Sequence, residues 1–211
     1  MLFRKIKEIV SEFTIDYQDI IREIESATLE EKIKFLTDIL PNEWLIQYKA
    51  FTHRPTDVVI FNYGQFDYIF DTYTYPKDWS PTISNPEIAR RVVAAFGRSA
   101  PPIENREVSR IKGWCGPTEK VFGKDSDKGH FIAHSIGGLL DVNLFPQRRD
   151  VNRGWSQKGK IFRAMEVYCA LNPGTFCFNH PIYKDHTDRP SFIEFGVLQK
   201  EGNLWVEIFE N

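Results

Sequence analysis

Apolar side chains recur every three or four residues through the first 40 positions, which is the spacing of helices that bury one face. The pattern predicts one helix over 2–25 and a second that begins at Thr28, where Glu31 completes a capping box, and ends at Pro41. Seven basic and ten acidic residues up to Ala50 make this part mildly acidic. We assign residues 1–50 to an N-terminal helical segment that docks on or caps the rest.

From Asp57 onward the pattern changes to β-branched and aromatic residues at strand spacing. Two such runs flank Gly64 and Gln65 and predict a hairpin. Asn85 and Pro86 begin a predicted helix that runs to Gly97. The remaining expected elements are short strands near 108–112 and 119–122, a helix over 159–171, a strand over 175–183 and a terminal hairpin over 191–210.

Helices first and a mixed strand-and-helix unit afterwards indicate an α+β fold. The 211 residues are divided into the helical segment and a second domain over 51–211. No run approaches the ~20 apolar residues of a membrane span, and charges interrupt the apolar residues at the N-terminus, unlike a cleaved signal peptide. Three cysteines, an odd and sparse set, suit a reducing compartment. We therefore expect no membrane partner and a cytoplasmic location, or delivery by a secretion system without a cleaved signal peptide.

One stretch departs from the formal net charge of -2. Between Asn143 and Ala164 the chain has six basic residues and a single acidic one. Such a local array binds polyphosphate backbones, although a solvated helix start has the same composition. The residues that we expect to contact nucleic acid are Arg148, Arg149, Arg153 and Lys158.

Two histidines stand four residues apart in the sequence DKGHFIAH, at positions 130 and 134. On a strand these positions share a face, so a metal pair is feasible. A zinc site needs two further ligands, yet the other three histidines are scattered and the cysteines form no CxxC motif. We treat a zinc-supported HNH-like protein as a minor alternative and expect His134 to be a hydrogen-bonding or core histidine.

Phosphodiester hydrolysis needs a base for water, a cation for the leaving oxygen and positive charge around the phosphorus. His130 follows a glycine and is the candidate base. Asn152 is a neutral oxygen ligand for Mg²⁺, which accepts few protein ligands and keeps several waters. Lys128 joins the arginines as part of the phosphate clamp.

These residues resemble the motifs of the DNA/RNA non-specific endonucleases with a ββα-metal (His-Me finger) core, and most closely the nuclease domains of bacterial polymorphic toxins. Residues 127–130, Asp-Lys-Gly-His, match the family's Asp-Arg-Gly-His. Gln147 matches its glutamine, Asn152 the metal-binding asparagine five residues later, and Trp155 the tryptophan that follows. The likeness covers about residues 108–211, with the core at about 108–170.

The resemblance implies that His130 is the general base and that Asn152 is the main protein ligand of Mg²⁺, with Mn²⁺ as an alternative ion. Lys128 keeps the charge of the motif's arginine but lacks its bidentate fork. Glu166 corresponds to an acidic residue that lies closer to the asparagine in the family. We carry Lys128 and Glu166 as candidate catalytic residues beside His130. Asp127, which we also expect to orient the turn, is a candidate metal ligand.

Asn143, Gln147 and His134 are expected to support the site, and Trp155 is a candidate for contact with nucleic acid. Asn143 and Gln147 are predicted to tie the loop between the second strand and the helix. Trp155 has two interpretations, stacking on a base or packing in the core. The sequence therefore predicts a metal-dependent endonuclease of low sequence specificity that acts on DNA and, as a further substrate, RNA.

The alternative function is a catalytically weak module that binds nucleic acid or a protein partner on the same scaffold. The likeness to toxin domains suggests a toxin or defence effector, and a toxin implies a cognate immunity protein.

Overall fold

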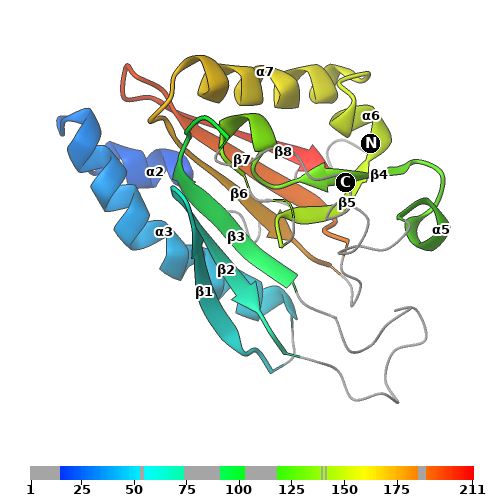
Figure 1. The fold of residues 1–211 in the computed structure, drawn as a ribbon. Coiled ribbons are helices and arrows are strands. Elements are labelled where there is room, and N and C mark those ends of the chain that lie inside the picture. Colours follow the sequence, from blue (N-terminus) through cyan, green and yellow to red (C-terminus); the bar gives the residue numbers. More distant parts are fainter. Residues whose placement is uncertain are drawn as a thin grey trace, which may run out of the picture.

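The structure is a computed structural model, and it describes residues 15–52, 55–73, 91–102, 118–138, 140, 142–184 and 189–211. Helices and antiparallel strands are mixed, as the predicted α+β class requires (Figure 1). The helices are α2 (Tyr17–Arg22), α3 (Leu29–Thr52), α5 (Thr118–Phe122), the 3₁₀ turn η2 (His134–Ile136), α6 (Arg149–Asn152) and α7 (Gln157–Leu171). The strands are β1 (Val58–Tyr63), β2 (Phe66–Asp71), β3 (Arg91–Arg98), β4 (Ser126–His130), β5 (Leu144–Arg148), β6 (Phe176–Ile182), β7 (Phe192–Leu198) and β8 (Leu204–Glu210).

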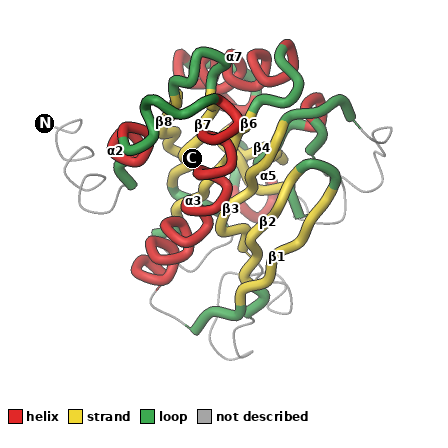
Figure 2. Tube along the Cα trace, turned by 90° about the vertical axis from the view of Figure 1, so that its left-hand side faces the viewer, coloured by secondary structure: helices red, strands yellow, loops and turns green. Residues whose placement is uncertain are grey.

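Six strands form one antiparallel sheet in the order β1-β2-β3-β6-β7-β8, and β4 pairs with β5 in a separate hairpin. Helices α2 and α3 cover one face of the large sheet, and they face the viewer in Figure 2. Helix α7 and the β4–β5 hairpin cover the other face. The large sheet is therefore the middle layer of the molecule.

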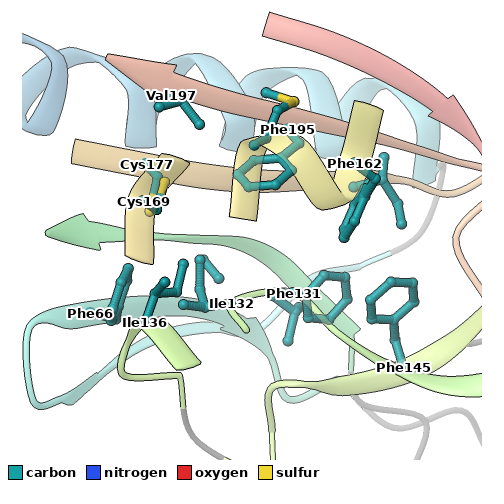
Figure 3. Packing of buried hydrophobic residues seen from close by; sticks show 14 of the residues in the cluster. Phe66, Phe131, Ile132, Ile136, Phe145, Phe162, Cys169, Cys177, Phe195 and Val197 are labelled. Carbon is teal, nitrogen blue, oxygen red and sulfur yellow. The ribbon is translucent and has the colours of Figure 1, made fainter. Parts of the chain in front are cut away.

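Side chains alternate along the strands and fill two separate cores. The α7-side core includes Phe66 and Tyr68 of β2 together with Phe131, Phe145, Phe162 and Phe195, and Figure 3 shows several of these side chains gathered between the sheet and α7. The α3-side core includes Ile69 of β2 together with Trp44, Phe96, Phe176 and Phe178. Consecutive residues of one strand thus stabilise opposite layers.

Helix α3 begins as predicted but does not end at Pro41. The Thr28 backbone N–H donates to Glu31 Oε2 at 2.8 Å, which confirms the capping box. The helix continues through the proline to Thr52. Its fully buried residues Leu36, Leu40 and Trp44 follow the i, i+4 spacing across Pro41. Packing of this stripe on the sheet outweighs the backbone hydrogen bond that a proline removes.

The predicted helix that was to end at Gly97 is wrong over its described part, because residues 91–98 form strand β3. This strand lies in the middle of the sheet, between β2 and β6, and residues 91–96 are all buried. A strand buried on both faces has a continuous apolar run instead of alternation, so periodicity does not distinguish it from a buried helix.

Most of the other predicted elements are observed. The hairpin around Gly64, helix α7, strand β6 and the terminal hairpin β7–β8 are confirmed. The predicted strand near 119–122 is wrong, because helix α5 occupies it. The expected helix over residues 2–14, the start of the helix at Asn85 and the strand near 108–112 lie outside the described residues. In the part of the chain that the structure describes, no helix is long and apolar enough to cross a membrane.

Candidate active site

The residues with motif likeness form a hairpin that continues directly into a short helix. Strands β4 and β5 pair so that Asp127 lies opposite Gln147 and His130 opposite Leu144. Helix α6 begins at the residue after β5, and the Arg149 backbone N–H donates to the Asp125 carbonyl at 2.7 Å. Asn152 is the last residue of α6 and does not open the following helix, which begins at Gln157.

Gly129 allows Gln147 to lie across the hairpin. A Cβ atom at position 129 would come within 2.1 Å of Gln147 Oε1 and 2.6 Å of its Cβ. Gln147 is 1% exposed. It therefore packs over β4 within the hairpin and does not tie the loop between β5 and the helix.

The chain immediately after His130 is fixed by two buried asparagines. Asn143 Oδ1 accepts from the Ile132 backbone N–H at 2.7 Å, and Asn143 Nδ2 donates to the Ile132 carbonyl at 2.5 Å. Asn179 of β6 donates to the Phe131 carbonyl. Asn143 thus ties the segment that precedes β5. The Asn143 contacts fix the chain that follows β4, where His130 is half-buried, and the Asn179 contact holds it against the large sheet.

Asp127 holds two arginines of the α6 region. Arg149 Nε donates to its Oδ1 at 2.9 Å, and Arg153 Nε donates to its Oδ2 at 2.6 Å. Asn152 Nδ2 lies 3.5 Å from Oδ2 of the same carboxylate. Partial burial opposes the charged form of Asp127, but the hydrogen bonds from Arg153 and Arg149 outweigh it and keep the pKa of Asp127 below its ordinary value.

The structure brings only some of the predicted site residues together. Asn152, Asp127, Arg149 and Arg153 form one cluster, which we call the Asp127 cluster. Successive side chains of a strand leave on opposite faces, so Lys128 and His130 alternate with Asp127 along β4. The candidate base thus belongs to the same hairpin as the cluster but projects from the other face of the strand.

Arg148 and Lys158, which were also predicted to contact nucleic acid, form ion pairs with acidic side chains. Arg148 Nε lies 3.0 Å from Asp150 Oδ1, and its Nη1 lies 3.3 Å from Glu210 Oε2. Lys158 Nζ lies 2.8 Å from Glu207 Oε2. Residues of β8 therefore offset part of the basic charge that is visible in the local sequence.

Trp155 lies on the surface. It is 63% exposed, and the Arg153 guanidinium lies 5.0 Å from the centre of its ring. The interpretation of Trp155 as a core residue is wrong. Its large apolar surface is instead presented to solvent beside basic side chains.

Glu166 and His134 belong to other elements than the Asp127 cluster. Glu166 occupies the middle of α7, where Arg163 Nη1 is 3.7 Å from its Oε2, and burial raises the pKa of Glu166 to about 7. His134 begins η2, whereas β4 ends at His130. The two histidines therefore do not lie on one strand, which was the condition for pairing them as metal ligands.

The donor set of the Asp127 cluster suits a hard ion with few protein ligands. The amide oxygen of Asn152 is such a donor, and Mg²⁺ completes its shell with waters and substrate oxygens. Both oxygens of Asp127 accept from guanidinium groups, so the carboxylate is better suited to holding the arginines than to binding a cation. Among the described residues, no three His, Cys, Asp or Glu side chains gather as a metal site, so this part of the chain does not fit structural zinc.

Sequence reasoning missed residues that reach the site from distant strands. Asn179 was assigned only to a strand, although a polar residue within the apolar run FCFNHPI was a visible signal. The side chain of the last residue, Asn211, accepts from the Arg148 backbone N–H at 2.7 Å and donates to the Pro146 carbonyl at 2.8 Å. No local pattern in the sequence indicated that the C-terminus supports β5.

Comparison with known proteins adds little to this geometry. No family profile and no curated protein matches the chain. A solved structure described as "Structure of Sda1 nuclease with bound zinc ion" matches with a TM-score of 0.35 and 25% identity, over 41% of this chain and 39% of that chain. The match thus spans about two fifths of that nuclease.

Proposed function

We propose that this protein is a metal-dependent endonuclease that hydrolyses phosphodiester bonds of DNA, and also of RNA, with little sequence specificity. The observation that carries the proposal is the strand–strand–helix order of residues 126–152. This unit has His130 at the end of its first strand and Asn152 in its helix. The resemblance to ββα-metal nucleases implies the general base and the metal ligand at these two residues, and this order of elements supports the proposal.

In this mechanism the imidazole of His130 takes a proton from the attacking water. Asn143 and Asn179 keep the end of β4 in place through the backbone of residues 131–132. Asn152 would hold Mg²⁺, or Mn²⁺ in its place, and the ion supplies positive charge at the leaving oxygen.

The Asp127 cluster positions and charges the site. Two guanidinium groups face one carboxylate, so the cluster keeps a net positive charge that attracts phosphate. Asp127 fixes the residues on either side of Asn152, because Arg149 begins α6 and Arg153 follows its last residue. Lys128 adds a further cation on the face of β4 that carries His130.

Plasmid cleavage tests the proposal. We expect nicking of supercoiled plasmid in Mg²⁺ or Mn²⁺ and none in EDTA. His130→Ala should lower the rate by about 100- to 10,000-fold, which is the range for a lost general base. Asn152→Ala should also lower it by about 100-fold or more, because a bound metal contributes several kcal/mol of charge stabilisation. His134→Ala and Asn42→Ala are the matched controls, since His134 lies outside β4 and Asn42 is exposed on α3. Cleavage by His130→Ala at the wild-type rate, in a folded variant, would exclude the proposed base.

A second function is favoured by the alternation of Asp127 and His130 along β4. If His130 and a metal ion on Asn152 cannot reach the same phosphate, residues 126–152 would bind nucleic acid or a protein partner and cleave weakly. Binding of nucleic acid without Mg²⁺-dependent cleavage identifies this alternative. In a toxin or defence setting, either function predicts an immunity protein that covers the Asp127 cluster, and the protein would act in the cytoplasm or be delivered by a secretion system.

A further inference from the structure

Four segments of the chain meet around a pocket next to the Asp127 cluster. The lining comes from the loop at 122–125, the junction of β5 and α6 at 148–150, Trp155, and Arg189 before β7. The pocket volume is about 520 Å³. Pockets that hold small ligands have volumes of this order.

The charge of the pocket favours an anion. Lys124, Arg148, Arg149 and Arg189 line it together with two acidic residues, Asp125 and Asp150. Asp150 is bound to Arg148 through two hydrogen bonds, of 3.0 and 3.2 Å. The four cations of the lining outnumber its two carboxylates, so the lining has a net positive charge.

Trp155 supplies a different kind of contact at the same place. Its ring is 63% exposed although it lines the pocket. Exposed aromatic rings beside cationic side chains bind unpaired bases by stacking. Arg153 lies over the ring and helps to hold its orientation.

Arg149 connects the pocket with the proposed metal ligand. It lines the pocket and donates to Asp127, the carboxylate that Asn152 also approaches. A strand whose scissile phosphate lies at Asn152 would place an adjacent nucleotide in this pocket.

We propose that this pocket binds one unpaired nucleotide of the nucleic-acid substrate, next to the cleaved phosphate. The base stacks on Trp155, and Lys124 and Arg189 bind its phosphate. This inference rests on the proposed function, and it names single-stranded or locally unpaired nucleic acid as the preferred substrate.

The test measures binding by fluorescence anisotropy with labelled single-stranded oligonucleotides, using the full chain with His130→Ala in EDTA, so that the substrate stays intact. Adding Trp155→Ala should weaken binding by about 5- to 100-fold, and Trp155→Phe should restore most of it. Lys124→Ala should lower the slope of log K against log salt by about 0.7. Leu171→Ala, an apolar residue 76% exposed, and Lys200→Ala, with its side chain 71% exposed, are the matched controls.

An abasic site moved along the oligonucleotide locates the stacked base. With the His130→Ala protein, we expect the abasic site to weaken binding when it stands at one position of the oligonucleotide and not at the others. When Trp155→Ala is added, the abasic site should weaken binding at no position. Equal binding with and without Trp155, or an equal dependence on Trp155 for fully paired duplex, would overturn the inference. Plasmid cleavage distinguishes this inference from the proposed function. If binding does not depend on Trp155 but the wild-type protein still cleaves plasmid, the pocket inference fails and the proposed function stands.

Discussion

Carboxylates on the two sides of the large sheet have different surroundings, one on the sheet itself and one in the β4–β5 hairpin that covers it. On the α3 side, Glu194 is 1% exposed, and its Oε2 accepts from the Tyr17 hydroxyl at 2.5 Å and lies 2.9 Å from His180 Nδ1. On the α7 side, Asp127 has a side chain that is 14% exposed and holds two arginines at the surface. A carboxylate therefore stabilises the fold at Glu194. At Asp127 it holds two arginines whose excess positive charge can attract a ligand.

The buried network joins the N-terminal helices to the sheet. Trp44 of α3 donates to the Tyr17 hydroxyl at 3.0 Å, and its ring stacks on His180 with centroids 5.9 Å apart. Burial, and next to it the charge of Glu194, raises the pKa of Tyr17, so the hydroxyl stays protonated and donates. This network links α2, α3, β6 and β7, and none of its members belongs to the Asp127 cluster.

The largest expected effect comes from removing Glu194. Glu194→Ala leaves the Tyr17 hydroxyl and His180 buried without their shared acceptor, so the free energy of unfolding should fall by about 3 to 5 kcal/mol. Urea unfolding followed by circular dichroism measures the loss. Cleavage per folded molecule should not change, because the network lies on the opposite face of the sheet.

Glu201→Ala in the β7–β8 turn is the control, since its side chain is 55% exposed. If Glu194→Ala prevents folding, Tyr17→Phe should still fold with a loss of about 1 kcal/mol. A loss for Glu194→Ala no larger than that of the control would remove the distinction between the two faces.

The large sheet shows where local sequence patterns suffice. Both hairpins of the sheet were predicted because strand alternation and turn residues lie close together in the chain. Strand β3 was not, because burial on both faces depends on β2 and β6 and leaves no alternation in its own sequence. Local periodicity predicts half-buried elements better than central ones.

The candidate site shows the same limit. The motif likeness of His130, Gln147 and Asn152 indicated this part of the chain as the site, but it gave the bounds of neither the β4–β5 hairpin nor α6. The ion pairs with Glu207 and Glu210 could not be predicted, since β8 reaches the site only through the folded sheet. Counting charges along the local sequence therefore overestimated the basic character of this surface.

Glu166 is a half-buried acid, and its effects on stability and on cleavage show whether it behaves like Glu194 or like Asp127. Its folded-state pKa of about 7 lies above the ordinary value of 4.5, so the folded state favours the protonated form. That preference is fully present below pH 4.5 and is lost as the pH rises through 7. Glu166→Gln should therefore be more stable than wild type by about 3 kcal/mol at pH 8 and equal to it at pH 4.5.

Urea unfolding at both pH values measures this difference, with Glu201→Gln as the control. We expect cleavage by Glu166→Gln to stay at the wild-type rate, because the described contact of Glu166 is with Arg163 in the middle of α7. A large loss of cleavage with no change in stability would instead support the predicted catalytic role of Glu166.

The smallest expected effect concerns the start of α3. Thr28 and Glu31 are exposed and bind each other's backbone N–H groups, at 2.8 and 3.4 Å. Thr28→Ala removes one half of this capping box and should lower the free energy of unfolding by about 1 kcal/mol. Ser26→Ala, just outside the box, is the control. Because α3 packs on the face opposite the Asp127 cluster, a change in cleavage per folded molecule would show that the two faces are coupled through the sheet.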